Sequence, residues 1–320
     1  MGFDVTIVGA GVIGAAAAFH LADRGFKVAL VSDGARGGSM AAAGMLSPSF
    51  EIGHDAADPT FAAMLRAGLA AWEDFAYRLA DDPYTAFGYH RRGVYGIGYH
   101  AVPQGAVVPE TGQALNGFTT LPSAFAPEEG AVEPAPFIET ALGVLQRQGG
   151  TLIKGRARLE AGAVIVNGER ISSAHVIIAT GASSGLGPES LQAVRGEAFV
   201  VELDPQDAGC VPTVVRSPTV YFVPRRDGSL YVGATEEWPG AIAGTADEVW
   251  RDAVRLLPAL SRVRSKVRVS GARPFLSRGG PLIHRDDEGS GVIRAQGHHR
   301  NGVLLAALTA QRLEDILRDS

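Results

Sequence analysis

Apolar residues follow two different periods along the chain. Residues 5–8 and 27–31 are short, largely β-branched apolar runs, which are typical of buried parallel strands. Residues 60–80 instead place apolar side chains near a spacing of 3.6, which predicts a helix that ends before Asp82-Pro83. This alternation of strand and helix patterns predicts an α/β fold.

The same two patterns continue to the C-terminus. A helix is predicted after Glu133-Pro134, and another near the end, starting at Gly302. Short or alternating apolar runs predict the remaining strands, at residues 94–97, 106–108, 151–153, 164–166, 175–179, 199–203, 220–223 and 230–232, with a helix near 248–257. The run at 175–179 enters Thr180-Gly181, as the first run enters a glycine turn, and should return the chain to the first sheet.

The turn after the first strand carries glycines at G-x-G-x-x-G spacing. Gly9 allows a tight turn, Gly11 lets a pyrophosphate approach the backbone, and Gly14 lets the next helix lie close to the sheet. Such a motif alone often forms only a tight loop. Its position between a predicted strand and a predicted helix favours a nucleotide, with the phosphates at the helix N-terminus.

The end of the second strand departs from the usual pattern. An acidic residue that binds the adenosine ribose is expected there, but the chain has Ser32, followed by Asp33 and Arg36. A neutral residue followed by arginine suits a 2′-phosphate, so an NADP-binding reductase is one alternative. Against it stands a second glycine-bearing segment at residues 297–305. Two such segments so far apart in the chain suggest one long dinucleotide held at both ends, which is FAD.

Composition excludes several classes. The net charge of -5 argues against a nucleic-acid surface, and no stretch approaches the ~20 apolar residues that span a bilayer. Cys210 is the single cysteine, so no intrachain disulfide can form and a cytoplasmic location is expected. The histidines lack ligand spacing, and we expect no metal site.

We predict two interleaved domains. Residues 1–83, 132–190 and 272–320 should form a discontinuous Rossmann-like FAD-binding domain. Residues 84–131 and 191–271 should form an inserted, antiparallel-rich α+β substrate-binding domain.

The chain resembles the glycine oxidase branch of the D-amino acid oxidase family, FAD enzymes that oxidise small amino acids and serve bacterial thiamine biosynthesis. Besides the glycine turn, the resemblance rests on blocks in family order over nearly the whole chain: residues 41–46 (AAAGML), 132–134 (VEP), 195–197 (RGE), 220–225 (VYFVPR), 233–235 (GAT), 271–274 (GARP) and 299–302 (HRNG). The segment 100–131 is shorter than in the family, which leaves the substrate less defined than the cofactor.

The resemblance implies a noncovalent FAD, a small amino-acid substrate, dioxygen as the acceptor, and scope for a homo-oligomer. Arg273 would bind the substrate carboxylate, Tyr221 would hydrogen-bond the same group, and Arg300 would lie where substrate and flavin meet. Together with the glycine turns, the FAD contacts would be Gly9, Gly11, Val12, Ile13, Gly14, Ser32, Asp33, Ser39, Ala43, Gly44, Met45, the backbone near Arg158, Thr180, Gly181, His298, His299, Arg300, Asn301, Gly302, Val303 and Leu304.

Physical chemistry agrees with two of these roles. A guanidinium matches a carboxylate bidentately, and a helix N-terminus can stabilise negative charge on a reduced flavin. The expected reaction is hydride transfer from Cα to flavin N5, hydrolysis of the imine, and reoxidation by dioxygen to hydrogen peroxide. Two alternatives share the fold: a dehydrogenase that passes electrons to a quinone or partner subunit, and a flavin-binding subunit without activity of its own.

Overall fold

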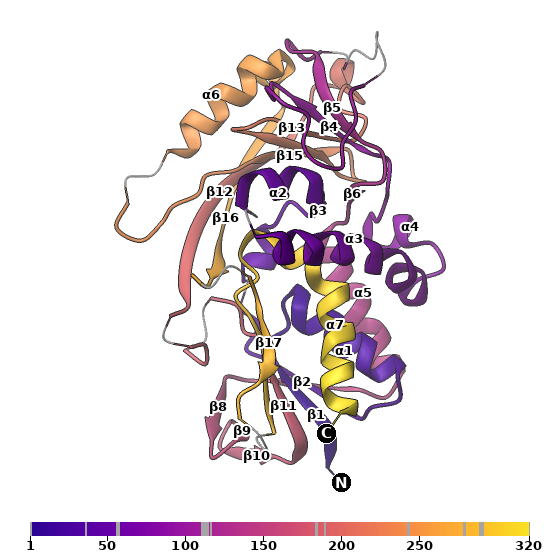
Figure 1. The fold of residues 1–320 in the computed structure, drawn as a ribbon, viewed down its shortest axis with the longest axis vertical. Helices are drawn as coiled ribbons and strands as arrows, with labels where there is room; N and C mark the ends of the chain where they lie inside the picture. Colours follow the sequence, from indigo (N-terminus) through magenta and orange to yellow (C-terminus); the bar gives the residue numbers. More distant parts are fainter. Residues whose placement is uncertain are drawn as a thin grey trace.

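The structure is a computed structural model that describes residues 2–35, 37–55, 58–109, 115, 117–182, 185–188, 190–241, 244–277, 280–287 and 291–319. Two large sheets lie toward opposite ends of the molecule, with most of the helices beside the lower sheet and between the two (Figure 1). The described helices are α1 (Val12–Asp23), α2 (Pro48–Asp55), α3 (Pro59–Leu79), α4 (Pro83–Phe87), α5 (Pro134–Arg147), α6 (Ala246–Leu256) and α7 (Gly302–Arg318), with 3-10 turns η1 (Gly38–Ala41), η2 (Pro205–Asp207), η3 (Pro258–Arg262) and η4 (His299–Asn301).

The first sheet has six strands in the order β17-β18-β11-β1-β2-β7. Its members are β1 (Phe3–Val8), β2 (Val28–Ser32), β7 (Thr151–Lys154), β11 (Ser173–Ile178), β17 (Leu282–Arg285) and β18 (Val292–Gln296). All neighbours are parallel except β17 and β18. The sequence prediction that residues 175–179 return to the first sheet is confirmed, because β11 pairs with β1 in parallel.

One core joins this sheet to its helices. The alanines at 15–18 of α1 are fully buried, and their small size lets α1 pack closely against α5 and α7. Trp72 of α3 is also fully buried in this core, edge-on to Phe137 of α5. The aromatic residues predicted on the 60–80 helix therefore serve packing. Asp58 caps the start of α3, and its side chain accepts a hydrogen bond from the Thr60 N–H.

The second sheet has seven strands in the order β16-β12-β15-β14-β13-β4-β5. They are β4 (Val94–Ile97), β5 (Pro122–Ala126), β12 (Gln192–Glu202), β13 (Val214–Arg216), β14 (Tyr221–Pro224), β15 (Ser229–Gly233) and β16 (Ser265–Phe275). Only β13 and β4 are parallel. A separate core that includes Phe199, Phe222 and residues of α6 lies against it.

Two small sheets complete the described chain. They contain β8 (Ala157–Glu160), β9 (Ala163–Val166) and β10 (Glu169–Ile171) in one, and β3 (Met45–Leu46) and β6 (Gly130–Ala131) in the other. Residues 106–108, predicted as a strand, form only isolated bridges from Ala106 and Val107. The predicted domain boundary at 271/272 falls inside β16, and the division into domains stays a prediction. The fold class, a Rossmann-like sheet with an antiparallel-rich second region, is confirmed.

Candidate active site

A cavity of about 830 Å³ runs from the carboxyl ends of β1, β2, β11 and β18 to the face of the second sheet. This volume lies within the range of small-molecule and cofactor sites, roughly 300–1,000 Å³. The carboxyl ends of parallel strands are also where α/β sheets bind nucleotides. The cavity therefore joins the predicted dinucleotide site to the sheet that carries Tyr221 and Arg273.

The glycine turn forms one wall of the cavity without side chains. Gly9 has a φ of +112°, which favours glycine, and a Cβ there would lie 2.4 Å from the Ala179 carbonyl oxygen. A Cβ on Gly14 would lie 1.8 Å from the Gly9 carbonyl oxygen, so α1 can approach the strand only with glycine there. Gly14 thus packs inside the motif, and Gly9 and Gly11 line the cavity.

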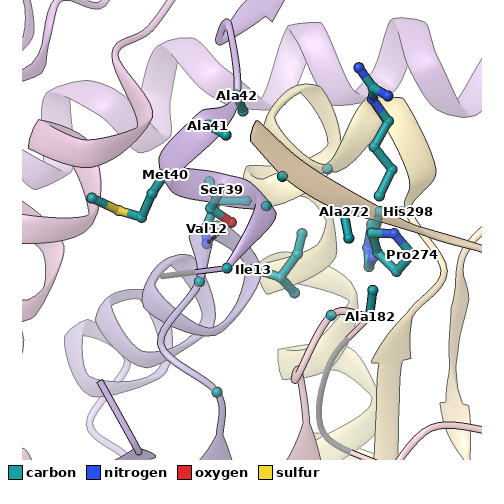
Figure 2. A pocket seen from close by; sticks show the side chains of 18 of the residues that line it. Val12, Ile13, Ser39, Met40, Ala41, Ala42, Ala182, Ala272, Pro274 and His298 are labelled. Carbon is teal, nitrogen blue, oxygen red and sulfur yellow. Dashed lines mark hydrogen bonds between the residues drawn. The ribbon is translucent and has the colours of Figure 1, made fainter. Parts of the chain in front are cut away.

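The N-terminus of α1 opens into this cavity. Its first turn contains no acidic residue and its N-cap, Gly11, provides no side-chain hydrogen bond. The Val12 N–H donates to the Ser39 Oγ at 3.0 Å, and Figure 2 shows the two residues side by side. Ser39 thereby ties η1 to the start of the helix. A helix start of this kind attracts an anion such as a pyrophosphate.

Ser32 and Asp33 line the cavity at the end of β2. The Gly34 N–H donates to the Ser32 Oγ at 3.1 Å, and the Ala35 N–H donates to an Asp33 carboxylate oxygen at 2.9 Å. Both side chains therefore stabilise their own turn, and their contact with the ribose stays a prediction. Arg36, on which the NADP alternative depended, lies outside the described residues.

A second helix, α7, also begins at the cavity. Asn301 and Gly302 line the cavity there, and the first turn of the helix has no acidic residue and no side-chain cap. The indole N–H of Trp72 donates to the Val303 and Leu304 carbonyl oxygens, each at 3.1 Å, which fixes this end of α7 against α3. The positive end of a second helix dipole thus faces the cavity.

His298 and His299, which precede α7, differ in their surroundings. His298 lies beside Pro274 (Figure 2), is 3% exposed and contacts the Thr309 hydroxyl at 3.0 Å. Burial lowers the pKa of His298 to about 3, so it is neutral at physiological pH. His299 has a positive φ of 47° and lies against Trp238 and Phe275.

Arg273 lies over the backbone of the neighbouring strand. Its Nη1 donates to the Arg195 and Thr235 carbonyl oxygens, each at 3.2 Å. A Cβ on Gly196 would lie 2.3 Å from that nitrogen, so glycine at 196 makes room for the guanidinium. Tyr221 lines the same end of the cavity, opposite Gly233 in the register and stacked on Tyr231 at 6.1 Å between ring centres.

Arg300 belongs to an ion-pair network that sequence reasoning missed. Its Nε lies 3.4 Å from Glu51 and its Nη1 lies 3.2 Å from Glu236. Glu51 also pairs with Arg216 at 2.6 Å, and both of these side chains are buried. His299 contacts Glu236 at 3.3 Å. The hydrogen bond from His299, together with Arg300, lowers the pKa of Glu236 to about 2.

Most of the predicted site residues meet at this one cavity. Those that line it are Gly9, Gly11, Val12, Ile13, Ser32, Asp33, Ser39, Ala43, Gly44, Met45, Thr180, Gly181, Tyr221, Arg273, His298, His299, Arg300, Asn301, Gly302 and Val303. Gly14 and Leu304 lie behind it. The side chain of Arg158 is 69% exposed and faces Glu160, whereas its neighbours Arg156 and Ala157 line the cavity.

These features fit FAD. Two helix starts without side-chain caps or acidic residues face the cavity, that of α1 at the glycine turn and that of α7 after η4. The turn between β1 and α1 presents bare backbone to the cavity, because a Cβ on Gly9 would clash with the Ala179 carbonyl oxygen. Within the described part of the chain, no group of three or more His, Cys, Asp or Glu residues could hold a metal ion. Nor is any helix among the described residues long and apolar enough to cross a membrane.

A Rossmann-like sheet whose cavity extends to a second, antiparallel-rich sheet defines a dinucleotide-dependent enzyme. The chain belongs to the DAO family of FAD-dependent oxidoreductases, whose family model matches residues 4–316. This confirms the resemblance inferred from the sequence blocks and makes FAD the cofactor, in place of NADP.

Individual relatives cover nearly the whole chain. A glycine oxidase from Bacillus licheniformis is 28% identical, over 98% of this chain and 93% of its own length. A bifunctional ThiO/ThiG protein from Trichormus variabilis is 27% identical over 98% of this chain and 52% of its own length. The crystal structure of Geobacillus kaustophilus glycine oxidase matches with a TM-score of 0.83 at 24% identity, covering 99% of this chain and 95% of that one. The crystal structure of iminodiacetate oxidase from a Chelativorans species matches with a TM-score of 0.84 at 20% identity, covering 99% of this chain and 95% of that one.

Proposed function

We propose that this protein catalyses the FAD-dependent oxidative deamination of glycine or another small amino acid or amine. The observation that carries the proposal is Arg273, a guanidinium that lines the cavity and makes no carboxylate ion pair among the described residues. The names of the similar proteins, several of them glycine oxidases, support the same reaction.

The side chains at the second sheet would hold the substrate. The Arg273 guanidinium binds a carboxylate bidentately, and the Tyr221 hydroxyl donates to the same group. These contacts fix the orientation of Cα, which is the main contribution a protein makes when the cofactor performs the chemistry. Arg300, held by Glu51 and Glu236, would lie where the substrate and the flavin meet.

Bound FAD would supply the acceptor for the hydride that leaves Cα, and dioxygen would take up the two electrons with two protons to become hydrogen peroxide. The start of α7 would stabilise negative charge at the cofactor end of the cavity. The substrate reacts as the neutral amine, so no side-chain base is required, and the imine then hydrolyses. Glycine would give glyoxylate and ammonia.

FAD would be bound without a covalent link. Cys210, the chain's one cysteine, packs against the core of the second sheet and does not line the cavity. Acid precipitation should release the yellow chromophore into the supernatant, where it runs as FAD on chromatography. Colour that stays with the pellet, or FMN in the supernatant, would overturn this assignment.

Product analysis in air tests the reaction. Purified protein incubated with glycine should produce hydrogen peroxide and glyoxylate in equal amounts. Glyoxylate formation that needs an added quinone, with no peroxide in air alone, would instead establish the dehydrogenase alternative. Absence of oxoacid with glycine, sarcosine, D-alanine and D-proline, under either condition, would refute the proposal.

A further inference from the structure

The charged side chains at the substrate end of the cavity form a network of ion pairs and leave one arginine outside it. The network contains two arginines, Arg216 and Arg300, and two carboxylates, Glu51 and Glu236, joined by ion pairs of 2.6, 3.4 and 3.2 Å. Positive and negative charges are therefore equal within it. Three of its members, all but Arg216, line the cavity.

The arginine outside the network is Arg273. In the described part of the chain its side chain makes no ion pair, although its charge contributes to lowering the pKa of Glu236, and its Nη1 donates only to backbone carbonyl oxygens. The Nη2 and Nε donors remain for a ligand, which is one bidentate carboxylate. The site thus offers one arginine without a direct carboxylate contact.

Glu51, Glu236 and Arg300 line this end of the cavity and Arg216 does not, so the part of the network that faces the cavity has one more carboxylate than arginine. The hydrogen bond from His299 and the nearby Arg300 lower the pKa of Glu236 to about 2, so Glu236 stays charged at neutral pH. Arg273 acts on the pKa of Glu236, and Glu51 shares Arg300 with Glu236, so a ligand whose first carboxylate occupies Arg273 would place a second one near these two carboxylates. Like charges brought together at an interface cost several kcal/mol, and here the arginine that could have offset the cost is already paired.

We propose that Glu51 and Glu236 make this enzyme selective for amino acids with a single carboxylate and against dicarboxylates. The inference rests on the proposed function, since it specifies the substrate class of that same site. The fold does not decide the matter, because it is shared by a glycine oxidase and an iminodiacetate oxidase. The number of carboxylates must therefore be set by side chains such as these.

Binding of unreactive ligands tests the selectivity separately from oxidation. Malonamate and malonate have nearly the same shape, but malonate carries a second carboxylate. Each is titrated into the FAD-loaded protein above neutral pH, and the dissociation constant is taken from the change in the visible flavin spectrum. Malonamate should bind at least roughly tenfold more tightly than malonate, given the cost of juxtaposing like charges.

Glu236→Gln should remove most of this preference, because it deletes one acidic group and leaves Arg300 able to accept a carboxylate. Glu236→Asp, which keeps the charge, should retain the preference. Glu128→Gln is the matched control, since the Glu128 side chain is 78% exposed and pairs with Arg91 away from the cavity. The FAD content of each variant shows that the fold is intact.

The wild-type comparison is decisive even if Glu236→Gln fails to fold. Equal affinities for the two ligands, or binding of neither, would overturn the inference. If the two ligands bound equally or not at all but glycine still reduced the flavin, the proposed function would stand and only the inferred selectivity would be refuted. A clear preference for malonamate in a protein that no amino acid reduces would support the charge selection and refute the oxidase.

Discussion

Glu129 gives a sharp test of the electrostatics around the site, because it is a buried carboxylate with incomplete hydrogen bonding. It is 3% exposed, accepts from the Ser49 N–H at 2.7 Å through Oε1, and has no hydrogen-bond partner at Oε2 among the described residues. Burial raises its pKa to about 7, with Glu51 adding to the shift and Arg216 opposing it. Ser49 lies in α2, the helix that carries Glu51.

The sign of the stability effect follows from the direction of this shift. The folded protein holds the proton more tightly than the unfolded chain, whose pKa is 4.5. The contribution of Glu129 is fully present below that pKa and is lost as the pH rises through about 7. With 1.36 kcal/mol for each pKa unit, the full loss is about 3 kcal/mol.

Glu129→Gln removes the titration but keeps an oxygen that can accept from Ser49. Relative to wild type, the free energy of unfolding of the variant should rise by about 2.5 kcal/mol from roughly pH 5 to pH 8.5, because the folded wild type releases most of the Glu129 proton in that interval. Any cost of the new amide is independent of pH and cancels in this difference. Glu128→Gln makes the same change at a side chain that is 78% exposed and serves as the control.

Thermal unfolding of the FAD-loaded proteins at the two pH values measures the effect. One kcal/mol corresponds to roughly 2 °C in the Tm of a protein of this size. The Tm of the variant minus that of wild type should therefore increase by about 5 °C from the lower to the higher pH. A gap that is the same at both pH values would refute the raised pKa. A gap that narrows at high pH would show that Glu129 is stabilised as the charged form.

Three other predictions concern the site itself. Arg273→Leu should lower kcat/KM for the best amino acid by an amount equivalent to roughly 2–5 kcal/mol of transition-state stabilisation, with flavin content unchanged, and Tyr221→Phe by the equivalent of about 1.5–3 kcal/mol. Wild-type kinetics in an Arg273→Leu enzyme with full flavin content would show that Arg273 does not bind the substrate carboxylate. Gly196→Ala places a Cβ 2.3 Å from Arg273 Nη1 and should weaken carboxylate binding by roughly 1–3 kcal/mol while FAD affinity stays the same; an unaltered KM would show that the guanidinium can shift without loss. Asp33→Ala should weaken FAD binding by roughly 1–3 kcal/mol, measured on the apoprotein, and unchanged affinity in the double Ser32 and Asp33 alanine variant would place the ribose contact elsewhere.

Local sequence patterns were sufficient for the parts of the fold that depend on short-range rules. The glycine spacing at residues 9–14 predicted the turn from β1 into α1, and a strand followed by Thr180-Gly181 predicted the return of β11 beside β1. Residues 106–108 show where such rules fail, because a β-branched run made only isolated bridges. Pairing partners, rather than propensity, determined the outcome there.

The acidic part of the site could not be predicted for a related reason. Glu51 and Glu236 meet Arg300 only because α2, the segment after β15 and η4 converge at the cavity. No sequence spacing joins positions so far apart. For Arg158 the prediction concerned the backbone near it, and its neighbours Arg156 and Ala157 line the cavity while its own side chain is exposed.

Anaerobic reduction of the bound flavin tests the central claim most directly. Glycine, sarcosine, D-alanine and D-proline are mixed in turn with the oxidised protein, and the visible absorption of the flavin is followed until air is admitted. We predict that at least one of them bleaches the flavin in the wild type and that the same compound reacts far more slowly with the Arg273→Leu variant. A flavin that none of the four reduces, or that the variant reduces at the wild-type rate, would contradict the account.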